Sequence, residues 1–416
     1  MYKNLKGVIF SIDGVIATGV ESNAVINNSL IFELGRLINY LLTNGLQPVV
    51  MANRDWTIGN QRLEDFVSNL WGNFPWYIAN RGDMPYKPSR EAINYVLEKM
   101  GWDDNETIYL GNSIDDMRTA VNGGILLLNT TWYCKNISYG FEFDSPHDVA
   151  RFIDIFCLRK HFWHYSINQK GLEYYSLGPY STHKPEFAIY SEDAKNTVKF
   201  GAGHPDFWTK YLLSTIYFSG LHKRIDLVAP YPGHKQGSTF NVIEEPMVIF
   251  TKCFNKAYLR DLVIRHTQST KSAFARSSGQ QVDHLNQLNT IRLNQYPFNP
   301  RGAGDKPYKN CPVKKGKTVL IVDDICTKGY SLEAARIYIE QTGAKVISLS
   351  WLKTINTDYA QIQDFSKFNP FQVNRFLAVD SVTRHPYKKY VLDPFAPEEI
   401  DSRLSEYDNW QWPTGI

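Results

Sequence analysis

The stretch VLIVDDICTKGYS, residues 319–331, joins a strand to a helix through a polar turn. Its apolar start, Val319–Val322, is typical of a buried strand. Two adjacent carboxylates, Asp323 and Asp324, follow that strand, and a small polar turn precedes a helix expected over residues 332–341. Because α/β proteins bind ligands beyond the carboxyl ends of their strands, this segment predicts a binding site.

Each part of the segment suits a phosphorylated sugar. The carboxylates of Asp323 and Asp324 can accept hydrogen bonds from vicinal hydroxyl groups. The turn places backbone N–H groups at a helix N-terminus, which favours a phosphate dianion, and Thr327 and Ser331 add hydroxyl donors. Gly329 permits a positive φ or a close backbone approach. The segment therefore predicts a site for ribose 5-phosphate.

This run resembles the phosphoribosyl pyrophosphate (PRPP) signature of type I phosphoribosyltransferases, in which a hydrophobic strand and two acids precede a Thr-Thr-Gly-x-Thr turn. Here Lys328 replaces the second Thr and Ser331 replaces the last one. Upstream, DLVAPYPGHK (residues 226–235) is similar to the pyrophosphate loop of the competence-protein-F-like (ComF-like) branch, where Pro-x-Pro follows a strand. The resemblance covers residues 223–351 in outline.

The resemblance implies a role for each matching residue. Asp323 and Asp324 would hold the ribose 2′- and 3′-hydroxyl groups, and cations would stabilise the departing pyrophosphate with Mg²⁺. For the acids alone, a solvated turn with a helix cap is the alternative, and for the cations an exposed segment without a ligand. The implied 5′-phosphate residues are Thr327, Lys328, Gly329, Tyr330 and Ser331; the pyrophosphate residues are Pro230, Gly233, His234 and Lys235; the catalytic cations are Arg265, Lys271 and Arg276.

The chain as a whole predicts two α/β units. Apolar runs alternate with amphipathic stretches through the first half, which favours a parallel sheet with helices on both faces. Residues 150–220 are aromatic without clear alternation, and we place a domain boundary near residue 155. We thus expect two Rossmann-like parallel-sheet domains, over residues 1–155 and 156–416. The expected strands are 7–12, 48–51, 76–79, 107–110, 125–128, 225–229, 318–322 and 345–349, with helices near 30–42, 61–70, 89–100 and from 115.

The N-terminal pattern resembles the haloacid dehalogenase-like (HAD) hydrolases. Their first motif is an apolar strand followed by Asp-x-Asp-Gly, and here Asp13 matches the acid/base while Ser11 stands in the nucleophile's place. The second motif falls on Ala52, which leaves Asn53 as the nearest polar residue. Of the later motifs, Lys87 matches the third, and GNSIDD (residues 111–116) matches the fourth, with Asp116 retained and Asn112 replacing a metal-binding Asp.

These replacements predict a HAD-like domain without phosphatase activity. A Mg²⁺ site needs hard carboxylate oxygens, and the positions of Ser11 and Asn112 lack them. A Ser hydroxyl without a neighbouring base is also a poor nucleophile. Two roles stay open for this domain: phosphate binding through Lys87, Ser113 and Asn53, or an assembly platform.

Composition limits the partners and the compartment. Lys and Arg total 45 against 42 Asp and Glu, so the net charge of +3 gives no strong field for nucleic acid or an anionic membrane. Five scattered cysteines favour a reducing compartment, and no signal peptide or membrane-length apolar run is seen. We therefore expect a cytoplasmic protein with no membrane contact.

Two functions compete on these observations. The first is PRPP-dependent phosphoribosyl transfer, or ribose-phosphate or nucleotide processing, with Mg²⁺ as cofactor and an inactive HAD-like domain. The alternative is a nucleotide-binding effector or sensor of a bacterial stress-response or anti-phage system, such as a retron, because such fusions resemble this one. The expected partners are PRPP or a nucleotide, a second copy or another protein, and nucleic acid only through that partner.

Overall fold

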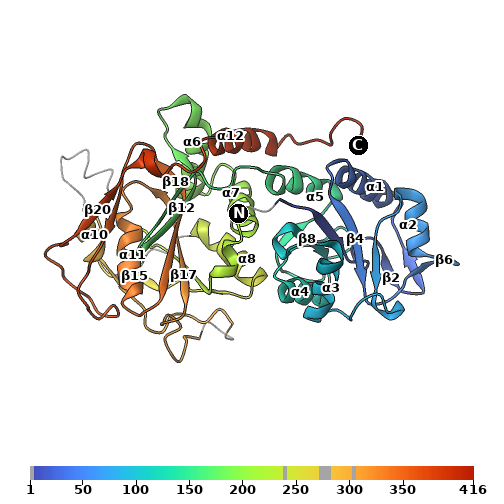
Figure 1. Ribbon diagram of the computed structural model, residues 1–416, viewed down its shortest axis with the longest axis horizontal. Coiled ribbons are helices and arrows are strands. Elements are labelled where there is room, and N and C mark those ends of the chain that lie inside the picture. Colours follow the sequence, from blue (N-terminus) through green and yellow to red (C-terminus); the bar gives the residue numbers. More distant parts are fainter. Residues whose placement is uncertain (1–3, 238–240, 271–282, 302–305) are drawn as a thin grey trace.

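The computed structural model describes residues 4–237, 241–270, 283–301 and 306–416, and these contain two six-stranded sheets (Figure 1). The first sheet is parallel throughout, and the second is parallel except at the β11 edge. This confirms the predicted fold class of two Rossmann-like α/β units. No helix of the described residues is long and apolar enough to cross a membrane.

The first sheet has the strand order β10-β9-β8-β1-β4-β7. The chain builds outward from β1 in one direction through β4 and then in the other through β8, so a topological switch point lies between β1 and β8. The strands are β1 (Gly7–Phe10), β4 (Gln47–Ala52), β7 (Trp76–Ile78), β8 (Thr107–Gly111), β9 (Leu126–Thr130) and β10 (Phe141–Phe143).

The helices of this unit begin where the sequence supplies capping side chains. The Ser89 hydroxyl caps α3, and Ser113 forms a capping box with Asp116 at the start of α4. Only the hairpin of β2 (Thr18–Val20) and β3 (Asn23–Val25) separates β1 from α1, so no large cap domain covers the sheet edge there. The helices are α1 (Asn28–Thr43), α2 (Leu63–Trp71), α3 (Arg90–Met100), α4 (Ile114–Gly123) and α5 (Pro146–Phe152), and a second hairpin joins β5 (Thr57–Ile58) to β6 (Gln61–Arg62).

The second sheet has the strand order β11-β12-β18-β17-β13-β14. Its first two strands form an antiparallel hairpin in the aromatic region where the sequence indicated no clear element. The switch point of this second sheet lies between β13 and β17, because β14 lies beyond β13 on one side and β18 lies beyond β17 on the other. The strands are β11 (Tyr165–Gln169), β12 (Leu172–Tyr180), β13 (Leu227–Pro230), β14 (Ala257–Tyr258), β17 (Thr318–Cys326) and β18 (Lys345–Thr354).

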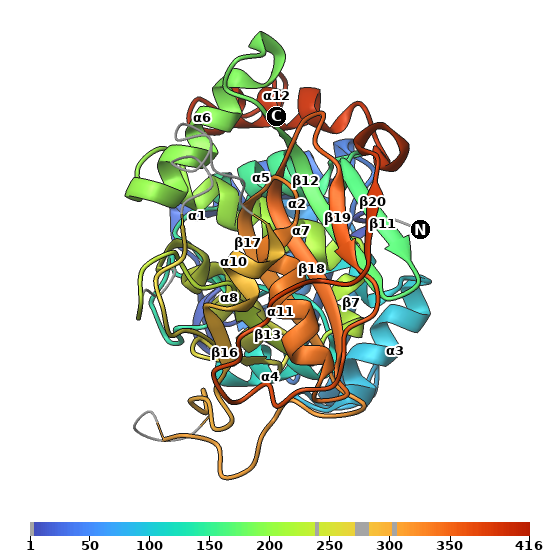
Figure 2. The ribbon, with the colours of Figure 1, turned by 90° about the vertical axis from the view of Figure 1, so that its left-hand side faces the viewer.

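Alternating side chains of β17 pack into two core clusters on opposite faces of the sheet. Leu320 and Val322 belong to the core cluster shared with the first unit, whereas Val319 and Ile321 pack in the cluster that contains α11. Figure 2 shows α11 in front of β17 and β18. The helices of this unit are α6 (Pro185–Phe200), α7 (Pro205–Phe218), α8 (Asn241–Cys253), α10 (His284–Leu288), α11 (Tyr330–Glu340) and α12 (Ala396–Tyr407), with strand pairs β15 (Val263–Arg265) with β16 (Ile291–Leu293) and β19 (Tyr359–Ile362) with β20 (Val382–His385).

Helix α7 joins the two units through their shared core. Every residue of α7 from Phe207 to Phe218 is buried. Near one end, the Trp208 ring stacks on Trp351 of β18, with 5.6 Å between the centroids. Near the other, the Tyr217 hydroxyl donates to the carbonyl oxygen of Thr107 in β8, at 2.6 Å. One hydrophobic cluster therefore continues from the first sheet to the second.

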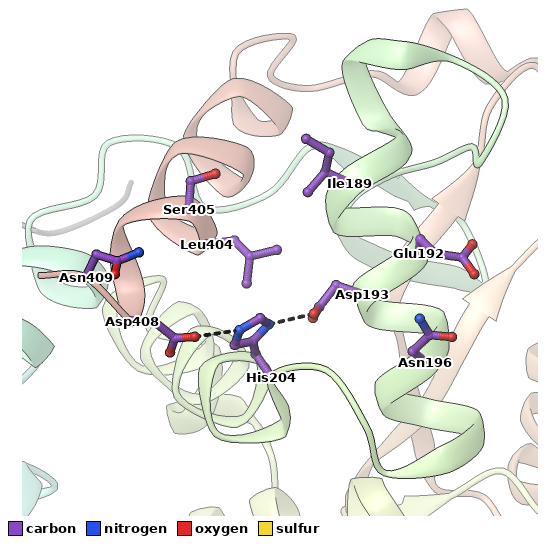
Figure 3. Close-up of a pocket in the computed structure, with 9 residues that line it drawn as sticks. All are labelled: Ile189, Glu192, Asp193, Asn196, His204, Leu404, Ser405, Asp408 and Asn409. Atoms are coloured by element: carbon purple, nitrogen blue, oxygen red, sulfur yellow. Dashed lines mark hydrogen bonds and ion pairs between the residues drawn. The ribbon is translucent and has the colours of Figure 1, made fainter.

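Helix α12 is anchored on α6 at a small cavity of about 400 Å³, shown in Figure 3. There the His204 ring lies between two carboxylates, with Nδ1 2.6 Å from Asp193 and Nε2 2.9 Å from Asp408. Burial by itself lowers the pKa of His204, but these two hydrogen bonds raise it by more, so the pKa lies above its usual value. The cavity is thus part of the contact between α6 and α12.

The residues after α12 return to the first unit (Figure 1). The Trp410 ring meets Tyr40 of α1 edge to face at 6.2 Å, and its indole N–H donates to the Asp154 carboxylate at 2.7 Å. The guanidinium of Arg36 lies 4.7 Å from the centre of a ring of Trp412. The C-terminal segment, which carried no functional signal in the sequence, is therefore a structural tie between the units.

We predict that Trp410→Ala lowers the free energy of unfolding by about 3–5 kcal/mol, because it removes a buried aromatic ring and its hydrogen bond. The control is Phe32→Ala, since Phe32 lies on the same helix as Tyr40 but is 76% exposed. Urea unfolding followed by circular dichroism measures both. Equal stability of the two variants would show that the tie contributes nothing.

Candidate functional site

The carboxyl ends of β13 and β17 meet at the switch point of the second sheet. Pro230 is paired with Val322, and the backbone N–H of Tyr231 donates to the Val322 carbonyl at 2.9 Å. The Pro-rich loop that follows β13 therefore starts beside the carboxylates of β17. Two segments about 90 residues apart in the sequence are brought to one place, where α/β folds bind ligands.

The acid pair lies inside β17 rather than after it. The sequence predicted that the strand ends at Val322, but β17 continues to Cys326 because β18 extends beside it to Thr354. Asp323 is paired with Ser350, whereas Asp324 has no partner in the register with β18. The continued pairing fixes the backbone that carries both carboxylates.

The two carboxylates are held close together. The backbone N–H of Asp324 donates to the Asp323 carboxylate at 3.0 Å. Burial raises the pKa of both groups, and the charge of Asp324 raises the pKa of Asp323 further. The Arg265 guanidinium acts against this shift on Asp323, and the Lys199 ammonium does so on Asp324. Hydroxyl donors from a ligand would therefore stabilise the ionised pair.

The turn before α11 has the shape that the sequence predicted. Gly329 adopts φ of +80°, and a Cβ there would lie 2.4 Å from the Tyr359 ring, so both conformation and packing require glycine. Within the described chain, the backbone N–H groups of Lys328, Tyr330 and Ser331 have no hydrogen-bond partner. These donors lie at the N-terminus of an 11-residue helix, which is a favourable place for an anion.

Arg265 lies at the end of β15 and is only 2% exposed. Its guanidinium donates to the carbonyl oxygen of Gly233 at 2.8 Å and to the side-chain oxygen of Gln287 at 3.1 Å, and it also bonds to Pro232 and Thr290. The alternative prediction, that Arg265 belongs to an exposed basic segment, is therefore wrong. Its donors hold the Pro-rich loop, and its direct contact with a leaving group stays a prediction.

The rest of the pyrophosphate candidates share this loop. The ring of His234 lies 3.0 Å from the hydroxyl of Ser269, whose backbone N–H donates to the His234 carbonyl at 3.1 Å. These contacts join the loop to the segment after β15. Pro230 thus ends β13 and Gly233, His234 and Lys235 follow in the loop that starts beside β17, while Lys271 and Arg276 lie outside the described residues.

Sequence reasoning missed Lys353, the fully buried residue that pairs with Cys326 in β18. Its ammonium donates to the carbonyl oxygens of Thr327 and Thr357. A lysine near the end of a strand with no other charge after its first residue, KVISLSWLKT, is the signal that could have found it, because charged residues are rarely fully buried without a partner.

At the edge of the first sheet, Lys87 is the centre of a closed hydrogen-bond network. Its ammonium donates to Asp116 at 2.7 Å, to the Tyr109 hydroxyl at 3.0 Å and to the Ser11 hydroxyl at 3.2 Å. Burial by itself raises the pKa of Asp116, but the charge and hydrogen bond of Lys87 lower it by more, so the pKa lies below its usual value. The buried network therefore holds one cation and one anion in mutual contact.

The other candidates of the first unit are also engaged. The Asn53 amide accepts from the backbone N–H of Lys87 at 2.7 Å and donates to its carbonyl at 3.0 Å. The Ser113 hydroxyl caps α4. Lys87, Ser113 and Asn53 are thus engaged with protein groups, and phosphate binding through them stays a prediction. The Asp13 side chain keeps contact with solvent, but neighbouring atoms partly enclose its carboxylate, and this desolvation together with the charge of Asp116 raises its pKa.

Asn112 fits its position as an amide and not as a carboxylate. Its side-chain N–H donates to the Cys134 carbonyl at 2.8 Å, and its oxygen accepts from the Asn136 backbone N–H at 3.3 Å. A carboxylate would have no donor for Cys134. Among the described residues, no group of three or more His, Cys, Asp or Glu side chains could hold a metal ion.

We predict that Asn112→Asp lowers the free energy of unfolding by about 1–3 kcal/mol, because at the buried position of Asn112 an acceptor then faces the Cys134 carbonyl. Asn168→Asp is the control, since Asn168 is exposed on β11 and makes the same change of charge. Thermal and urea unfolding of the two variants provide the comparison. A gain of stability in Asn112→Asp would mean that the site is built for a carboxylate.

Comparison with solved structures finds hydrolases of the HAD superfamily over the N-terminal region. One, of subfamily IA from Geobacter sulfurreducens, is 15% identical; the match covers 36% of this chain and 99% of that chain, with a TM-score of 0.24. Another, from Ehrlichia chaffeensis, is 16% identical, with 37% and 98% covered and a TM-score of 0.27. At these TM-scores the likeness carries no further argument.

The comparison with curated proteins finds no match. The comparison with protein families matches residues 254–364 to the phosphoribosyl transferase domain. This match spans the acid pair of β17, the turn before α11, Arg265 and Lys353. The C-terminal half therefore contains a phosphoribosyl transferase domain, which confirms the resemblance drawn from residues 319–331.

Proposed function

We propose that the chain binds PRPP or a nucleotide at the carboxyl edge of the second sheet and transfers or processes its phosphoribosyl group. One observation carries the proposal: a pair of carboxylates and a turn with free backbone N–H donors follow each other along β17 and α11. Carboxylates accept hydrogen bonds from hydroxyl groups, whereas backbone N–H groups donate hydrogen bonds to anions. A phosphorylated sugar presents both of them a few bonds apart.

The residues take these roles in the bound state. Asp323 and Asp324 accept hydrogen bonds from the ribose 2′- and 3′-hydroxyl groups. The N–H groups of Lys328, Tyr330 and Ser331 bind the 5′-phosphate, and the dipole of α11 stabilises its charge. The exposed Lys328 side chain adds a cation where the family pattern has a hydroxyl.

The reaction breaks the bond between the anomeric carbon and a pyrophosphate oxygen and forms a new bond from that carbon to an acceptor. Positive charge develops on the ribose as the bond breaks, and the nearby carboxylates stabilise it. The Pro-rich loop, held in place by Arg265, starts beside the strand of the acid pair and would contact the leaving group. Lys271 and Arg276 remain candidates for neutralising the pyrophosphate.

The carboxylates of Asp323 and Asp324 fit a Mg²⁺ ion that binds together with the pyrophosphate group of the substrate. Mg²⁺ is commonly bound by one or two carboxylates together with substrate phosphate oxygens, and the acid pair offers two carboxylates. Pyrophosphate oxygens would supply the remaining anionic ligands. When bound, Mg²⁺ supplies charge neutralisation for the departing pyrophosphate.

We also propose that the HAD-like unit has no phosphatase activity. The position of the nucleophile holds the Ser11 hydroxyl, which accepts a hydrogen bond from the Lys87 ammonium. A hydroxyl in contact with a cation and without a base gains no nucleophilic character. With Asn112 bonded to Cys134, the network around Lys87 stabilises the unit instead of binding a metal.

We predict that PRPP with Mg²⁺ binds the wild-type chain and binds the Asp323→Asn, Asp324→Asn double variant at least about 100-fold more weakly, because two charge-assisted hydrogen bonds are lost. Isothermal titration calorimetry measures the affinities. The double variant Asp364→Asn, Asp380→Asn is the matched control, since both acids are exposed in the same half. Unchanged affinity after loss of the acid pair would refute the proposed site.

We predict no release of phosphate from p-nitrophenyl phosphate in the presence of Mg²⁺ above that of a protein-free blank. The assay is run on wild type and on Asp13→Ala side by side. Phosphate release by the wild type that disappears in Asp13→Ala would show that the HAD-like unit is an active hydrolase.

A further inference from the structure

The ammonium of Lys353 is buried behind the turn that precedes α11. Parallel pairing with β17 places Lys353 beside Cys326, one residue before the turn begins. The residue is fully buried, and its ammonium lies 5.7 Å from the ring centres of both Tyr165 and Tyr387. These two tyrosines, from β11 and from the segment after β20, enclose the side chain.

The partners of this cation are neutral oxygen atoms. The ammonium donates to the Thr327 carbonyl, to the Thr357 carbonyl at 2.6 Å and to the Thr357 hydroxyl at 2.7 Å. No carboxylate of the described chain lies within ion-pair distance of it. A fully buried charge without a counter-ion is costly, because carbonyl dipoles replace its hydration only in part.

The bonds of Lys353 fix the orientation of the turn. The Thr357 hydroxyl also donates to the Thr327 carbonyl, at 2.8 Å, so two donors hold this oxygen on the inner side of the turn. A second contact, from the N–H of Ala360 to the Lys328 carbonyl at 2.9 Å, acts in the same way. With both carbonyl oxygens bound from behind, the N–H groups of Lys328, Tyr330 and Ser331 are left for a ligand.

From this geometry we infer that Lys353 is a positioning residue for phosphate recognition, and that the phosphate dianion of the ligand acts as the missing counter-ion of its buried charge. The inference rests on the proposed function, because it assumes that a phosphate occupies the turn. It adds a residue behind the turn to the recognition of a sugar phosphate. Substrate contact stays with the backbone N–H groups, and Lys353 acts through Thr327.

This inference gives the site a defined dependence on pH. Burial lowers the pKa of Lys353 to about 8, and a dianion bound nearby would raise it again. The neighbouring groups titrate elsewhere: the pKa of Cys326 is about 11, that of Tyr387 is about 12, and those of Tyr165 and Tyr174 are raised by burial. The remaining charged neighbour, the Asp358 carboxylate, raises the pKa of Lys353.

Binding of ribose 5-phosphate, measured by calorimetry between about pH 7 and 9.5 in two buffers of different ionisation enthalpy, tests the inference, since the phosphate is a dianion throughout. We predict that wild-type affinity falls about tenfold as the pH rises through the pKa of Lys353, and that binding takes up protons near pH 8. Lys353→Met should bind weakly at every pH and take up none.

Two further variants keep the test decisive. Lys353→Arg retains a cation that does not titrate in this range, so its affinity should not depend on pH, which a purely structural role would not produce. Lys345→Met, at the exposed start of the same strand, should behave as wild type. Binding by wild type without pH dependence or proton uptake would overturn the inference, whereas no binding by wild type at any pH would overturn the proposed function itself.

Discussion

The parallel pairing of β17 with β18 beyond the carboxylates is the constraint on which the site depends. If β17 ended at Val322, Asp323 and Asp324 would lie on an unsupported turn. Pairing as far as Cys326 and Lys353 instead fixes both acids on a strand and places a buried cation behind the next turn. Ligand-binding groups held by a regular element are better positioned than groups on a loop.

The sequence predicted the residues that act through their own local pattern. The apolar run before Asp323, the glycine at position 329 and the serines that cap α3 and α4 are local signals, and the structure has the expected elements there. The amide of Asn112, at a position where the resembled pattern has an Asp, could also be read directly from the sequence. Its bond to the Cys134 carbonyl could not, because that contact joins segments 22 residues apart.

Residues whose role depends on distant partners could not be predicted. Arg265 was predicted as a cation for the leaving group, with an exposed segment as the alternative, but its guanidinium bonds to the Gly233 carbonyl of a loop 32 residues upstream. The neighbours of the Lys353 ammonium, Thr327, Thr357, Tyr165 and Tyr387, come from separate parts of the chain, and only the fold brings them together. Trp410 and Trp412 likewise pack against residues of α1, at the other end of the chain.

The first unit contributes to the whole through packing. Helix α7 and the C-terminal tryptophans join it to the second sheet by a continuous core, and its own centre is filled by the contacts of Lys87 and Asn112. A closed network of this kind stabilises a fold without needing a ligand. In the described residues, three backbone N–H groups without a hydrogen-bond partner lie together at the turn before α11, where a ligand could complete them.

The most direct test of the account is a crystal structure of the protein with ribose 5-phosphate. The account predicts the phosphate within hydrogen-bond distance of the N–H groups of Lys328, Tyr330 and Ser331, with the ribose hydroxyl groups on Asp323 and Asp324. A sugar phosphate bound elsewhere, or those N–H groups bonded to protein oxygens in its presence, would contradict it.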